Sequence, residues 1–152
     1  MRLEQFYLID RIDELVAAEG RIRCRADVPA ESTVFEGHFP GHPLMPGVLL
    51  VEAMAQGSGY LLLAINGFSR MPLLAEIGSA KLRRFVLPAT VLVITGALDH
   101  EGSGYAVTRG SVEHDGRTVA EAELRFRTLP FPSERTRDLM REHARRIGLP
   151  DA

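Results

Sequence analysis

Two side chains that could exchange protons, His38 and Glu52, lie close together in the sequence. His38 is in a stretch rich in proline and glycine, and Glu52 is in the apolar run that follows it. Glu52 is the only charged residue between Val48 and Ile65, in an otherwise apolar run. A carboxyl group in an apolar interior is favoured in its protonated form, and a neutral histidine accepts a proton near neutral pH. The pair therefore offers an acid and a base. A histidine packed in a loop and a glutamate hydrogen-bonded to buried backbone would explain the same residues, and spacing alone does not separate the two interpretations.

The segments that contain the two residues predict how the pair is held. The stretch from Phe35 to Pro46 contains three prolines and two glycines, which is typical of a loop, and it carries His38. From Gly47 to about Asn66 the sequence predicts a helix, and a helix that is apolar on all sides is expected to be buried. Gln56 follows Glu52 by one turn, where it could orient the carboxyl group or be a satisfied core amide.

Other chemistries fit these residues less well. His42 follows His38 by four residues, but Pro40 and Pro43 exclude a helix that would aim both rings at one metal ion. Ser58 lacks the glycine-flanked turn of a serine nucleophile. We therefore expect neither a metal site nor a cofactor.

The remaining chain predicts an antiparallel sheet that would wrap around the helix, an α+β fold. A short helical turn and a first strand are expected between Leu3 and about Leu15. In the segment Thr118–Thr128, apolar residues alternate with charged ones, as in a strand with one buried face. Further strands are expected at Arg21–Val28, Leu74–Leu87, Val91–Asp99 and Tyr105–His114.

A basic tail follows residue 129. Ser133 is a good helix N-cap, and Gly148 and Pro150 predict a stop. Leu139 and Ile147 share a helical face with His143, and arginines occupy much of the rest. A narrow apolar stripe that docks this helix, with a solvated outer face, is favoured over a partner-binding site.

The amino-acid composition limits the classes of protein to which the chain can belong. The 152 residues, 45% hydrophobic and 25% charged, suggest one domain with an adequate core. A net charge of −2 implies no general attraction to nucleic acid or to membranes. The single Cys24 cannot form an internal disulfide and is expected to be a small, half-buried residue. The first residues do not resemble a secretory signal, and the apolar run is interpreted as a core helix, so we expect a cytoplasmic protein without membrane insertion.

The segment GHFPGHPLMPGVLLVEAMAQ resembles the signature of the FabZ-type (3R)-hydroxyacyl-acyl carrier protein dehydratases. Tyr7–Ile12, Ala80–Leu92 and Asp115–Leu124 resemble further parts of that family, so the resemblance covers most of the chain. It implies a hot-dog fold over residues 1–129, with residues 130–152 as a C-terminal helical extension.

The resemblance also implies an activity, the dehydration of (3R)-hydroxyacyl-acyl carrier protein to the trans-2-enoyl product in fatty acid biosynthesis. By that likeness His38 is the base and Glu52 the acid, contributed by opposite subunits, and the backbone N–H of Gly47 holds the thioester carbonyl. Gln56, Phe39 and Val48 complete the expected substrate site. The expected partners are an acyl carrier protein and a second copy of the chain, as a homodimer or a trimer of dimers.

The sequence departs from the family pattern at several places. The family usually has a further segment before its first strand, whereas this chain starts almost at the strand. The family's Pro-Gly-Asp triplet reads Pro88-Ala89-Thr90, and its Arg-Phe pair reads Lys81-Leu82. With the added basic tail, this combination resembles a branch that serves unusually long acyl chains of bacterial lipid A. Sister isomerase-dehydratases carry aspartate where this chain has Glu52, so cis-3 isomerisation is not expected. The alternatives are a hot-dog acyl thioesterase and a non-catalytic acyl-carrier-binding protein.

Overall fold

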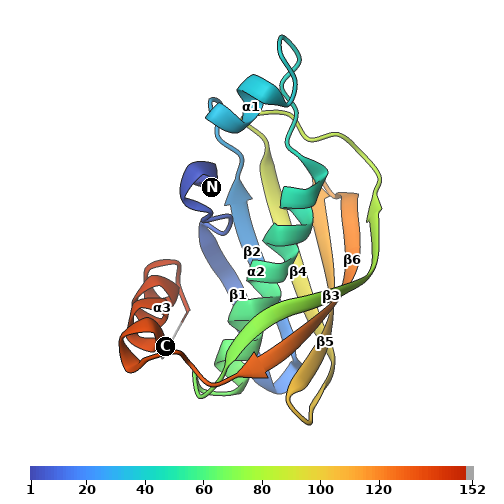
Figure 1. Cartoon of the computed structure of the whole chain (residues 1–152). Helices are drawn as coiled ribbons and strands as arrows, with labels where there is room; N and C mark the ends of the chain where they lie inside the picture. The colour runs from blue at the N-terminus through green and yellow to red at the C-terminus, as the bar shows by residue number, and fades with distance from the viewer. Residues whose placement is uncertain (150–152) are drawn as a thin grey trace.

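Six strands form one antiparallel sheet that curves around a long central helix, α2, in a computed structural model that describes residues 1–149 (Figure 1). The strand order is β1-β2-β4-β5-β6-β3, so β1 and β3 are the edges. The strands are β1 Arg11–Val16, β2 Arg21–Asp27, β3 Met71–Leu82, β4 Val91–Gly102, β5 Tyr105–His114 and β6 Arg117–Leu129. The helices are α1 Thr33–Gly37, α2 Gly47–Ile65 and α3 Glu134–Arg146, with single 3-10 turns at Leu3–Gln5 and Ala17–Glu19. The α+β prediction is confirmed.

Helix α2 is the core of the fold, as its apolar sequence predicts. Leu50, Met54, Leu61 and Leu62 are each at most 2% exposed. A β-carbon added to Gly110 of β5 would lie 2.8 Å from Cβ of Met54, so glycine at that position lets the sheet approach the helix closely. The apolar run has the length and composition of a membrane span, but 56% of it is buried within the fold. It therefore serves as a core helix here.

The burial of α2 is one-sided, so the prediction of burial all round is wrong for the single chain. Val48 is 73% exposed, and Glu52 and Gln56 are only half-buried. The reason is geometric, since one curved sheet can cover only one side of a helix. Most residues of edge strand β3 are also exposed to solvent, including the apolar Ile77 at 48% and Leu82 at 54%.

Several element boundaries differ from the sequence-based expectation. The predicted loop from Phe35 begins inside helix α1, which is capped by the Ser32 hydroxyl group. The strand predicted at residues 74–87 lies at Met71–Leu82. Its pairing with β6 ends at Leu82, and irregular chain follows, with Ala89 at a φ of 59°. The strand predicted to end at Asp99 continues to Gly102, because its ladder with β5 extends to the hairpin turn.

Other predictions are confirmed. Strand β5 has the expected bounds, and along β6 Ala120, Ala122, Leu124 and Phe126 are buried on one face. Cys24, expected to be half-buried, is fully buried, and this burial raises the pKa of its thiol to about 12.

The tail forms helix α3, and the backbone N–H of Thr136 donates to the Ser133 hydroxyl group, as expected of an N-cap. Ile147 is buried as predicted, but Leu139 is 56% exposed, so its predicted packing is wrong. Ala144 and Ile147 are buried against the body, so the C-terminal half of the helix docks while Leu139 faces solvent. Pro150, predicted to help end the helix, lies outside the described residues.

Candidate active site

His38 directly follows α1, whose start is fixed from the N-terminal segment. One carboxylate oxygen of Glu4 accepts from the Ser32 hydroxyl group at 2.7 Å and from the backbone N–H of Thr33 at 3.0 Å. The hydrogen bond from Ser32 lowers the pKa of Glu4. The segment that leads into His38 is therefore anchored at a point far away in the sequence.

The histidine ring is oriented by Leu44. Nδ1 of His38 lies 3.0 Å from the carbonyl oxygen of Leu44, and the N–H of Leu44 donates to the carbonyl of His38 at 2.8 Å. A carbonyl oxygen can only accept, so in the neutral ring Nδ1 carries the hydrogen and Nε2 keeps its lone pair. This is the tautomer that a general base requires.

Phe39 packs beside this ring. The two ring centroids are 4.2 Å apart with an interplanar angle of 25°, and the peptide bond between His38 and Phe39 is cis. Reciprocal backbone hydrogen bonds of 3.1 and 2.9 Å join Phe39 to His42 and close the loop. Phe39 remains 49% exposed, so it offers an apolar surface next to the base.

An apolar cavity of about 380 Å³ opens beside His38. Its lining includes Phe39, Gly47, Leu82 and Phe85. Gly47 is the first residue of α2, where backbone N–H groups have no partner within the helix and the helix dipole favours negative charge. An oxygen on which charge develops during a reaction would be stabilised there.

Glu52 lies on the half-open side of α2, held by Gln56. The side-chain amide of Gln56 donates to Glu52 Oε1 at 2.9 Å and to the carbonyl of Phe6 at 2.9 Å. Its own oxygen accepts from the backbone N–H of Leu8 at 3.0 Å. The predicted pairing of Gln56 with the glutamate is therefore present, and the N-terminal segment fixes the amide.

A second cavity, of about 320 Å³, contains Glu52 and Gln56. Tyr60 of the same helix also lines it, and other elements contribute Phe126 from β6 and Met140 from α3. The remaining lining residues are Ala55, Gly59, Leu63, Pro72, Leu73 and Leu74. The cavity is mostly apolar, with the carboxyl group as its charged member.

The structure of one chain does not bring the predicted acid and base together. His38 lines one cavity, with Phe39 and Gly47, and Glu52 lines the other, with Gln56. Val48 belongs to neither of these two linings and is exposed on the uncovered face of α2. Sequence reasoning missed Tyr60, although its spacing of four from Gln56 places it on the same helical face. Met140 carried no such signal, because only the docking of α3 brings it near.

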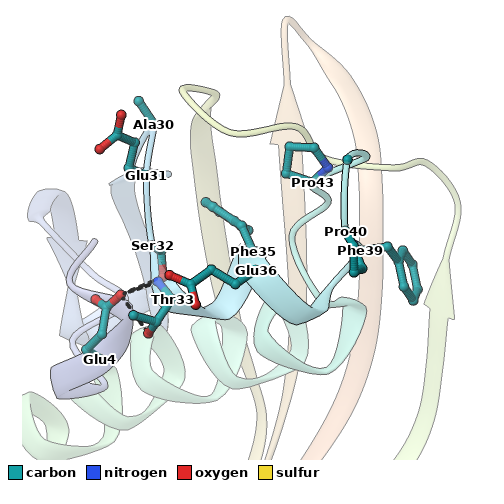
Figure 2. Close-up of a pocket in the computed structure, with 11 residues that line it drawn as sticks. Glu4, Ala30, Glu31, Ser32, Thr33, Phe35, Glu36, Phe39, Pro40 and Pro43 are labelled. Carbon is teal, nitrogen blue, oxygen red and sulfur yellow. Dashed lines mark hydrogen bonds between the residues drawn. The ribbon is translucent and has the colours of Figure 1, made fainter.

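A larger, open groove of about 620 Å³ is lined in part by the loop that follows His38, including Phe39, Pro40 and Pro43 (Figure 2). Figure 2 shows Glu4 bonded to Ser32 and Thr33 at one end of this groove and Phe39 at the opposite end. Glu31 and Glu36 add exposed carboxylates to its lining. Within residues 1–149 no three His, Cys, Asp or Glu side chains gather as metal ligands.

Comparison with solved structures identifies the fold. A hypothetical thioesterase with coenzyme A from Streptococcus pneumoniae matches with a TM-score of 0.64 at 17% identity, covering 81% of this chain and 88% of that one. The dehydratase heterocomplex ApeI:P from Xenorhabdus doucetiae matches with a TM-score of 0.57 at 19% identity, covering 72% and 88%. At these identities the likeness shows the fold alone, which is the hot-dog fold.

Comparison of sequences identifies the family to which the chain belongs. Residues 2–123 match the FabA-like domain. The FabZ 3-hydroxyacyl-[acyl-carrier-protein] dehydratase of Thermus thermophilus is 40% identical over 125 residues, which cover 80% of this chain and 85% of that protein. The FabZ of Enterococcus faecalis is 34% identical over 122 residues, covering 80% and 86%. The chain therefore belongs to the FabA-like family, among the FabZ-type 3-hydroxyacyl-acyl carrier protein dehydratases.

Proposed function

We propose that this protein dehydrates (3R)-hydroxyacyl-acyl carrier protein to trans-2-enoyl-acyl carrier protein in fatty acid biosynthesis, with His38 as base and Glu52 of the partner subunit as acid. The observation that carries the proposal is the hydrogen bond between Nδ1 of His38 and the carbonyl of Leu44, beside the N-terminus of α2. It leaves Nε2 free to accept a proton next to a site that stabilises an oxyanion. The names of the FabZ relatives support the same reaction.

The chemistry assigns one task to each group. Nε2 of His38 takes the proton from C2 of the acyl chain, while the N–H groups at Gly47 stabilise the charge that builds on the thioester oxygen. The electrons of the broken C2–H bond form the C2–C3 double bond as the C3–O bond breaks. Glu52 gives its proton to the departing hydroxyl group, so the products are the enoyl thioester and water. Gln56 holds the carboxyl group in place through its hydrogen bond to Oε1.

The separation of the two cavities supports a shared site. Within one chain His38 and Glu52 line different cavities, and Glu52 lies on the face of α2 that the sheet leaves uncovered. Edge strand β3 next to this face exposes Ile77 and Leu82. Exposed apolar side chains on an unpaired edge strand favour pairing with a second copy. A two-fold dimer would offer two equivalent sites, each with groups from both chains.

A product assay on (3R)-hydroxyacyl thioesters tests the proposal. We expect the absorbance of a conjugated enoyl thioester to appear without release of free thiol. His38→Ala is expected to lower turnover by roughly 10²-fold, the contribution typical of a general base. The matched control is His42→Ala, which removes an exposed ring from the same loop and is expected to retain turnover. Thiol release without enoyl product would instead indicate a thioesterase, and binding without either product would indicate a carrier-binding protein.

A further inference from the structure

Helix α3 lies beyond residues 2–123, the part of the chain that matches the FabA-like domain, yet it is packed firmly onto the body. The backbone N–H of Ile12 in β1 donates to the carbonyl of Ile147 at 2.6 Å. Ala144 is fully buried, and Leu149 just beyond the helix is 3% exposed. Figure 1 shows α3 lying beside β1. The helix is therefore fixed against the N-terminal part of the sheet.

One side chain of α3, His143, contacts the N-terminal segment by stacking on Tyr7. The ring centroids are 4.4 Å apart with an interplanar angle of 24°, and the Arg2 guanidinium lies over the Tyr7 ring at 4.7 Å. Tyr60 of α2 approaches His143 at 6.3 Å. Burial, followed by the charges of Arg146 and Arg2, lowers the pKa of His143, so the ring is neutral at neutral pH. A neutral ring stacks on tyrosine without the cost of burying a charge.

Phe6 and Leu8, the neighbours of Tyr7, bind the side-chain amide of Gln56, which in turn binds the carboxyl group of Glu52. The carbonyl of Phe6 accepts from Gln56, and the N–H of Leu8 donates to Gln56. Phe6 has a φ of 62°, a left-handed conformation that a residue with a side chain keeps only when its surroundings hold it. Gln56 then donates to Glu52 Oε1. A continuous set of contacts thus runs from α3 to the carboxyl group.

We propose that His143 is a positioning residue for the dehydration: by stacking on Tyr7 it fixes the backbone groups that hold Gln56, and so it fixes the orientation of the Glu52 carboxyl group. A second contact of the same helix agrees with this role, because Met140 lines the cavity that contains Glu52 and Gln56. The inference rests on the proposed function, since it gives Glu52 the role of the acid.

A tail that merely stabilises the fold would behave differently. Its loss would lower the free energy of unfolding but would leave the turnover of the folded protein unchanged. The chain offers a matched control in a second histidine–tyrosine pair, His100 and Tyr105, whose ring centroids are 4.9 Å apart in the β4–β5 hairpin. This pair lies outside both site cavities.

The experiment compares full-length His143→Ala, His143→Phe, His100→Ala and Glu52→Gln with wild type, measuring kcat and KM on a small (3R)-hydroxyacyl thioester. We expect His143→Ala to lower kcat roughly tenfold with KM within about twofold, because a small misplacement of a reacting group costs turnover rather than binding. His143→Phe keeps a flat ring and should recover most of kcat. His100→Ala should match wild type.

Hydrogen exchange at the backbone amide of Leu8 measures whether the contacts between His143, Tyr7 and Gln56 remain in place. This N–H is fully buried and donates to Gln56, so in His143→Ala it should exchange faster, while in His100→Ala it should not change. The inference would be overturned if folded His143→Ala kept the wild-type exchange rate at Leu8 or the wild-type kcat. If Glu52→Gln is inactive in the same experiment, the proposed function still stands. Wild-type turnover in Glu52→Gln would instead overturn the proposed acid.

Discussion

Mixing two inactive variants is expected to restore activity if each site takes its base from one chain and its acid from the other. His38→Ala keeps Glu52, and Glu52→Gln keeps His38. In a mixed dimer one of the two sites then combines two intact residues, while the other combines two altered ones. Separate cavities for the two groups within one chain are the structural reason to expect this.

The size of the recovery follows from two-fold symmetry. Equal amounts that exchange freely give about half mixed dimers, each with one working site of two, so the mixture should reach about a quarter of wild-type activity per chain. The assay follows enoyl formation after dissociation and reassociation of the two variants, with mixed dimers counted by mass spectrometry of tagged chains.

The control mixes Glu52→Gln with the double variant His38→Ala/Glu52→Gln, which contains no intact acid and should stay inactive. Fully formed mixed dimers without recovered activity would refute the shared site. Activity in unmixed Glu52→Gln near the wild-type value would refute the role of the glutamate.

Three further predictions concern the scaffold. Gly110→Ala forces a β-carbon against Met54 and should lower the free energy of unfolding by about 1–3 kcal/mol in urea denaturation, and an unchanged midpoint would show that the sheet can move away. The Cys24 thiol, with its pKa raised from 9.0 to about 12, should resist alkylation in the native state. Because the unfolded chain loses this proton first, stability should fall as pH rises from 9.0 towards 12, and Cys24→Ala should remove that part of the fall. Ser133→Ala removes the acceptor of the Thr136 N–H and should cost about 1 kcal/mol, seen as faster hydrogen exchange confined to α3; equal exchange would show that the cap contributes little.

The local elements could be predicted wherever near neighbours in the chain determine them. The apolar run predicted α2 to within a residue, and the alternation along β6 predicted its buried face, because helical and strand periods depend only on residues a few positions apart. Errors occurred where a partner far away in the sequence sets the boundary. Strand β3 ends where its ladder with β6 ends, and α3 turns Ala144 rather than Leu139 towards the body because of the surface it meets.

The sequence by itself determined the chemistry on offer: a histidine in a proline-rich loop, a single carboxyl group in an apolar helix, and an amide one turn later. Only the tertiary structure decided how these groups relate. The curved sheet leaves one side of α2 uncovered, and within one chain His38 and Glu52 line different cavities. The docking of α3 places His143 on Tyr7, and through Gln56 connects the tail to the acid. These contacts join residues from opposite ends of the chain, and they depend on the path of the whole backbone rather than on any local pattern.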